Sequence, residues 1–229
     1  MLTASDANRQ DAAPRFLHCT IANGLEPLSE FALGSVRSFG GNFVMRIILA
    51  GLAGAVAMYV WTSVAHVATP LGSIGFSQIP NEQPVMDAMR TSIGAKPGLY
   101  FFPWVDPNDA NAMKLEAERM KTNPSGFVIY TPPGASGEMT GQLIGEFVKE
   151  FVTALIAAYL LSMTMLSSYV GRVGFVALLG AAAAIMTNGS YWIWYHFPLD
   201  YSLAYSFIEF VGYVAAGLAM AAVLKPKPA

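Results

Sequence analysis

Four long apolar stretches constrain what this chain can fold into more than any other feature of its sequence. They cover residues 45–68, 143–170, 173–195 and 203–224. A helix needs about 20 mostly apolar residues to cross a bilayer core of about 30 Å, and each stretch reaches that length. With 54% hydrophobic and 12% charged residues, the chain also has too little polar surface for a soluble globule. We therefore predict an all-α membrane protein with a four-transmembrane-helix bundle.

The basic residues near the ends of the apolar stretches predict the orientation of the bundle. Short loops that carry Lys and Arg stay in the cytoplasm. Such residues flank the first stretch, separate the second from the third and follow the fourth: Arg37, Arg46, Arg172, Lys225 and Lys227. The segment between the third and fourth stretches has no Lys or Arg. Both termini are therefore predicted to be cytoplasmic, and residues 69–142 extracytoplasmic, in a plasma membrane.

The predicted extracytoplasmic segment, residues 69–142, carries its own secondary-structure signals. Asn81 precedes a short helix that Gly94 would end, and a second helix is expected from Ala110 to Lys121. The sequences GLYFF and GFVIY read as two strands. This pattern predicts a small α+β insertion. We expect its aromatic residues to form its own core or to contact the membrane, and not to enclose a ligand: Tyr100, Phe101, Phe102, Trp104 and Tyr130.

Residues 1–44 mix Gly, Pro, Ser and charges of both signs without a sustained period. Such a composition predicts a disordered N-terminal extension. Met45 and Arg46 directly precede the first apolar stretch and would make a natural start, so residues 1–44 are expected to be dispensable. The alternative is that residues 45–68 form a cleaved signal peptide. Their apolar core is longer than that of a signal peptide, and no A-x-A site follows it.

The chain resembles a family of small, uncharacterised bacterial inner-membrane proteins. The resemblance covers residues 45–224 and is carried by PLGSIGFSQIPNE after the first span, then GLYFFP and SGFVIY, and finally three closely spaced spans. It implies a bacterial inner membrane, four spans and an external insertion between the first two. It implies no catalytic residue.

Motifs that would indicate an enzyme or a cofactor site are missing from the sequence. There is no GxSxG elbow, Walker loop, HExxH motif or dinucleotide fingerprint. The single Cys19 excludes an intramolecular disulfide and a CxxC metal motif. Two facing histidines, His66 and His196, could ligate a haem, but histidines at a membrane interface more often serve as anchors. We predict no cofactor, no metal site and, from the net charge of −2, no nucleic-acid partner.

The third apolar stretch contains the sequence Asn188-Gly-Ser, which can be a glycosylation acceptor or a turn. A helix that ended at Thr187 would keep only 15 residues from Val173, too few to span a bilayer. We therefore predict a helix that continues through Asn188. At that depth the acceptor motif would be hidden from a glycosyl transferase.

Polar side chains gather near the outer ends of the apolar stretches and form the candidate binding site. Glu209 lies about six residues, or roughly 9 Å, below the predicted outer boundary. A carboxylate there costs several kcal/mol unless it finds a donor or is protonated. Asn188 is expected at the same depth, with Lys149 and His66 above. One interpretation is a hydrogen bond that only fixes helix register. The other is a proton or headgroup site made of five residues: Glu209, Asn188, Glu150, Lys149 and His66.

Three functions are compatible with these observations. The first is a noncatalytic binding or assembly component of the envelope, which would contact the lipid bilayer and a protein partner or a second copy of itself. The second is a binding or transport site for a lipid headgroup, another small molecule, an ion or a proton in the outer half of the bundle. The third is an intramembrane enzyme that modifies a lipid. The sequence favours the first, because no catalytic motif is present.

Overall fold

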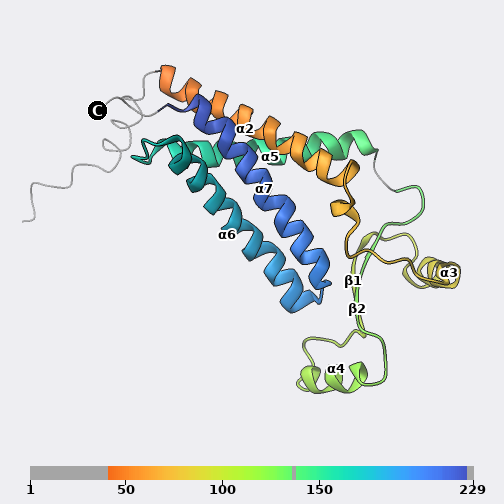
Figure 1. Cartoon of the computed structure of the whole chain (residues 1–229). Coiled ribbons are helices and arrows are strands. Elements are labelled where there is room, and N and C mark those ends of the chain that lie inside the picture. Colours follow the sequence, from red (N-terminus) through yellow and green to blue (C-terminus); the bar gives the residue numbers. More distant parts are fainter. Residues whose placement is uncertain (1–40, 136–137, 226–229) are drawn as a thin grey trace, which may run out of the picture. The chain divides into compact units, whose positions relative to one another are not determined.

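The computed structural model describes residues 41–135 and 138–225 of the 229-residue chain. This part contains six α-helices, one short 3₁₀ helix and one two-stranded sheet (Figure 1). Three of the helices are long and apolar enough to cross a membrane: α2 (Gly41–Val67), α6 (Tyr169–Tyr195) and α7 (Leu199–Val223). They indicate a membrane protein. The predicted disordered extension lies outside the described residues, except that residues 41–44 belong to α2.

The second predicted span corresponds to α5 (Met139–Ser162), which differs from the other three long helices. It has 24 residues and is therefore about 36 Å long. Glu146, Lys149 and Glu150 lie in its first half, and α5 is not among the helices that qualify as spans by length and hydropathy. The described structure thus contains three candidate spans, where the sequence predicts four.

The four long helices pack in the order α5, α2, α7, α6. Helix α2 contacts both α5 and α7, and α7 contacts α6, whereas α5 and α6 make only a few contacts although they follow each other in the chain. Small and apolar side chains fill the interfaces, which allows the close helix approach expected in membranes. The buried core includes Ala50, Ala55, Ala154, Ala157, Ala158, Val176, Ala216 and Met220.

A glycine sets the close approach of α6 to α7. A Cβ atom added to Gly180 would overlap Cβ and Cγ of Tyr213. The helical period of the sequence predicts a small-residue face on the third span that contains Gly180, Ala181 and Ala184. Helix α6 continues without a break through Asn188, as predicted. The ring of Tyr213 is thereby held between α6 and the centre of the helix assembly.

The turn between α5 and α6 comes earlier in the chain than predicted. The predicted second span runs to Val170, but α5 ends at Ser162 and α6 begins after Ser168, whose hydroxyl accepts a hydrogen bond from the Gly171 amide at 3.0 Å. This serine cap explains the shift, because it satisfies an amide that the first helical turn leaves free. Arg172, predicted in the loop, lies inside α6, is buried and donates a hydrogen bond to the carbonyl oxygen of Leu224.

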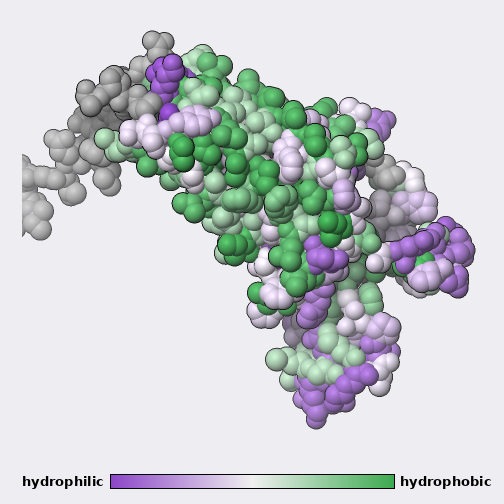
Figure 2. Space-filling view, in the orientation of Figure 1, coloured by the Kyte–Doolittle hydropathy of each residue, from purple (hydrophilic) through white to green (hydrophobic). Residues whose placement is uncertain are grey.

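The segment between α2 and α5 contains the predicted helix-strand-helix-strand order. It comprises the 3₁₀ helix η1 (Pro70–Ser73), α3 (Glu82–Ile93), β1 (Gly98–Phe102), α4 (Ala112–Met120) and β2 (Gly126–Tyr130). The strands pair antiparallel, with Tyr100 opposite Val128. Figure 2 shows hydrophilic residues over α3 and α4 and hydrophobic residues over the long helices.

The insertion has little hydrophobic core of its own. Helices α3 and α4 have no buried residue, and Trp104 is exposed, while Tyr130 is buried. Aromatic contacts connect the insertion to the long helices: the ring of Phe127 lies 5.2 Å from that of Tyr195, and the ring of Phe76 lies 5.6 Å from that of Tyr201. Among the aromatic residues expected to form a core, Tyr100 contacts Tyr130, and Phe101 contacts Phe127 within the insertion.

Candidate functional site

A cavity of about 640 Å³ lies among α2, α5, α6 and α7. Its volume is in the range of about 300–1,000 Å³ that small-molecule sites occupy. All five residues of the predicted site line this cavity: Glu209, Asn188, Glu150, Lys149 and His66. Residues from four separate stretches of sequence therefore meet at one place, which is the geometric condition for the predicted site.

Glu150 is the most deeply buried polar group of the cavity, with 2% of its surface exposed. Its Oε1 accepts a hydrogen bond from the Thr62 hydroxyl of α2 at 2.9 Å. Its Oε2 is buried and has no hydrogen-bond partner within residues 41–135 and 138–225. A buried polar atom without a partner costs about 1–3 kcal/mol, more when it is charged. The site thus contains one strong acceptor that the described residues leave unfilled.

Glu209 and Asn188 form a hydrogen-bonded pair between α7 and α6. Asn188 Nδ2 donates to Glu209 Oε2 at 3.2 Å and to the carbonyl oxygen of Ala184 at 3.2 Å. Asn188 is buried and Glu209 is half-buried. Asn188 is the partner that the sequence predicts for Glu209, and this contact is confirmed. It is a single neutral hydrogen bond, so it does not neutralise a charge on Glu209.

Lys149 and His66 are not bound to Glu209, although the sequence made them candidate partners. Lys149 Nζ lies 2.6 Å from Glu146 Oε1 on the same helix, and both side chains are exposed. His66 Nδ1 lies 2.9 Å from the carbonyl oxygen of Thr62. The physical reason is local: partners three or four residues away on the same helix are within reach without any change in helix packing.

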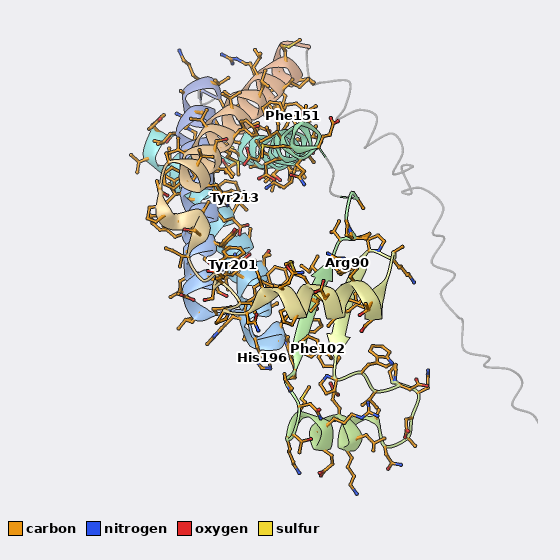
Figure 3. The ribbon with its side chains drawn as sticks, turned by 90° about the vertical axis from the view of Figure 1, so that its right-hand side faces the viewer. Arg90, Phe102, Phe151, His196, Tyr201 and Tyr213 are labelled. Carbon is orange, nitrogen blue, oxygen red and sulfur yellow. The ribbon has the colours of Figure 1, made fainter. Side chains whose placement is uncertain are left out.

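An aromatic wall lines the cavity along α7, and its first member, Tyr201, lies outside the predicted fourth span. Tyr201, Tyr205, Glu209 and Tyr213 follow one another at intervals of four residues, which places them on one face of the helix. Figure 3 labels the first and the last of them, Tyr201 and Tyr213. The rings of Tyr201 and Tyr205 stack with centroids 4.2 Å apart. The ring of His66 meets the Tyr205 ring edge-on at 5.6 Å.

The start of α7 explains why Tyr201 was missed. The predicted fourth span begins at residue 203, whereas α7 begins at Leu199, so Tyr201 was left outside the helix. The signal was nevertheless present, because the same spacing of four residues relates Tyr201 to Tyr205 and Tyr205 to Glu209.

The cavity is open to the surface, and exposed residues of α5 and α6, together with His66 and Val67 of α2, line its open part. Leu143 of α5 and Thr187 of α6 both line it and are exposed, and Thr153 of α5 is half-buried. These side chains stay accessible because the two helices make few contacts with each other. An opening between two long apolar helices is suited to a ligand that has an apolar part.

Acidic side chains outnumber basic ones in the cavity wall. Three carboxyl groups line the cavity, those of Glu146, Glu150 and Glu209, against the single ammonium group of Lys149. Among the described residues, no group of three or more His, Cys, Asp or Glu side chains could hold a metal ion. The arrangement can therefore supply hydrogen-bond acceptors and negative charge in a partly desolvated setting.

No protein-family model matches this chain, and no curated protein or solved structure matches it either. The resemblance to small bacterial inner-membrane proteins therefore remains a prediction. The cavity and its carboxyl groups are the strongest functional feature of the described residues.

Proposed function

We propose that this chain is a noncatalytic membrane protein of the bacterial inner membrane whose cavity binds a small amphipathic molecule. The observation that carries the proposal is the cavity of about 640 Å³ with the buried Glu150 carboxyl in its wall. An assembly protein that only packs its helices has no need of a cavity with an unfilled acceptor, because helix packing favours filled interfaces. Because of this cavity, we favour the binding hypothesis over the assembly hypothesis.

The amphipathic character of the ligand is argued from the two parts of the site. Carboxyl, amide and hydroxyl groups from all four long helices converge at one level, which suits a polar headgroup. Met58 and Ile208 add apolar surface, and the accessible side between α5 and α6 is flanked by apolar helix faces. A polar end held inside and an apolar chain leaving between two helices is the arrangement expected for a molecule taken from the bilayer.

The proposal includes α5 as a fourth span. Its buried alanines pack against the core, while Val148, Val152 and Ile156 are exposed on the other side. An exposed apolar face on a helix about 36 Å long is what lipid contact requires. The charged residues of α5 do not oppose this, because Glu150 faces the cavity and Lys149 is paired with Glu146 near the predicted outer end.

The four-span arrangement and the predicted orientation can be tested with reporter fusions. Fusions after Asp109 and Pro198 should report an extracytoplasmic position, and a fusion at Ala229 a cytoplasmic one. If α5 did not cross the membrane, only α6 and α7 would separate Asp109 from Ala229, and both fusions would report the same side. That result would overturn the four-span proposal.

Ligand binding can be tested by filling the cavity. Thr153 lines the cavity, whereas its neighbour Val152 is exposed and is not among the lining residues. Native mass spectrometry of the protein, extracted in a neutral detergent, should show one bound amphiphile in stoichiometric amount on the wild type and on Val152→Trp. Thr153→Trp should lose it, because the indole occupies the site.

Both variants add the same side chain to the same helix, so a general effect of tryptophan on α5 would act on both. Equal retention of the amphiphile by Thr153→Trp and Val152→Trp would refute the proposed site. Absence of any bound amphiphile from the wild type, together with no binding of added amphiphiles, would do the same.

A further inference from the structure

We infer that the polar end of the ligand is an organic cation, a primary or quaternary ammonium group attached to an apolar chain. This inference rests on the proposed binding function of the same cavity and specifies its chemistry. Three features of the described residues point to it: the charge of the wall, the unfilled acceptor on Glu150 and the aromatic faces.

The first feature is that two of the three carboxyl groups in the cavity wall, those of Glu150 and Glu209, form no ion pair with another described residue. Among the described residues, no ion pair involves Glu150 or Glu209, and the lysine nearest to them, Lys149, is paired with Glu146. Carboxylates that are removed from water are stable only when they are paired, hydrogen-bonded or neutral. A bound cation would provide the missing charge for both.

The second feature is the Glu150 carboxyl group, whose two oxygen atoms differ in their hydrogen bonding. Thr62 donates a hydrogen bond to Oε1, so a neutral donor holds the carboxyl group in position, while Oε2 is buried and has no partner among the described residues. A side chain with 2% exposure cannot obtain its partner from bulk water without opening the site. An ammonium group bound beside Glu150 would supply the positive charge that the Thr62 hydroxyl does not provide.

The third feature is the aromatic surface beside the carboxyl groups. Tyr201, Tyr205 and Tyr191 line the cavity with Glu209. Aromatic faces attract cations within about 6 Å of the ring centroid, and the attraction grows when the site is desolvated. Carboxylates combined with aromatic rings form a recurrent environment for ammonium groups, because both offer negative potential.

The opposite charge is disfavoured by the same wall. An anionic headgroup would meet the carboxyl groups of Glu146, Glu150 and Glu209, and the single Lys149 is already bonded. Like charges in a partly desolvated site repel each other strongly. Two kinds of molecule carry an ammonium group on an apolar chain: a lipid with a zwitterionic headgroup, and a free alkylamine.

The test is calorimetric titration of the purified protein in dodecyl maltoside micelles with three octyl compounds that differ in charge. Octyltrimethylammonium is the cation, octylsulfonate the anion and octyl glucoside the uncharged control. Thr153→Trp is titrated in parallel, so that partition into the micelle can be subtracted. We expect the cation to bind at least about tenfold more tightly than the other two, as the loss of one charge-assisted contact implies.

Two substitutions test the carboxyl groups individually. Glu209→Gln keeps an acceptor for Asn188 but removes the charge, and Glu150→Gln keeps an acceptor for Thr62. Each should weaken binding of octyltrimethylammonium about tenfold or more and leave octyl glucoside unchanged. If Glu150→Gln does not accumulate, Glu209→Gln and the charge preference of the wild type still decide the question.

The outcomes separate this inference from the function on which it rests. Equal binding of all three compounds to the wild type, abolished by Thr153→Trp, would keep the amphiphile site and overturn the cation. If none of the three compounds binds the wild type more tightly than Thr153→Trp, both the amphiphile site and the cation would be overturned. If the cation is preferred, titration with lysophosphatidylethanolamine and with octylamine distinguishes the two sources, since the true source should bind more tightly.

Discussion

The contact between α6 and α7 at Gly180 allows a stability prediction whose size follows from the structure. In Gly180→Ala the new Cβ would overlap Cβ and Cγ of Tyr213, which are too close to their own backbone to move aside. Gly174 lies on the same helix, and a Cβ added there meets nothing within 4 Å. Both substitutions gain about 1 kcal/mol of helix propensity, so their difference isolates the overlap. Overpacking of this kind costs about 1–3 kcal/mol.

Unfolding can be followed by circular dichroism in maltoside micelles that contain increasing fractions of dodecyl sulfate. Gly174→Ala should be as stable as the wild type or more stable by about 1 kcal/mol. Gly180→Ala should be less stable than Gly174→Ala by about 1–3 kcal/mol. Equal stability of the two variants, within about 0.5 kcal/mol, would show that α6 and α7 do not approach each other as described.

Three further substitutions address the cavity and its supports. Thr62→Val should destabilise the protein by about 1–3 kcal/mol, because the Glu150 carboxyl loses its hydrogen bond, while Thr62→Ser should not; equal unfolding curves would refute this. Arg172→Met should cost about 1–3 kcal/mol through the lost hydrogen bond to the Leu224 carbonyl, and unchanged unfolding would contradict the described end of α7. Glu209→Gln should change stability by less than about 1 kcal/mol while ligand affinity falls, and a folding defect as large as that of Thr62→Val would favour a structural role.

The helical period explains why much of the site could be predicted from the sequence. Glu209 and Asn188 lie in apolar stretches, where a polar side chain has to turn inward, and depth along a helix follows directly from residue number. The pairing of these two residues could therefore be predicted before the helices were placed. The small-residue face that includes Gly180 follows from the same period.

The remaining features depend on information that a helical period does not contain. The hydrogen bond between Thr62 and Glu150 joins residues 88 positions apart, and its existence depends on the rotation of α2 against α5. Lys149 can pair with Glu146 on its own helix or with a carboxyl group on another helix, such as that of Glu209. The distance to the second kind of partner depends on how the helices pack. The start of α6 is set by the cap at Ser168 and not by hydropathy, which varies too slowly along the chain to locate a turn.

The central claim is that an amphipathic cation binds with its head at Glu150 and Glu209. The most direct test is a crystal structure grown with octyltrimethylammonium that carries a bromine atom at the end of its chain. We expect electron density for the ammonium group in the cavity, within contact distance of Glu150 and Glu209, and an anomalous bromine peak between α5 and α6. A bromine peak found only on the lipid-facing surface of the helices, with the cavity closed around Glu150, would contradict the account.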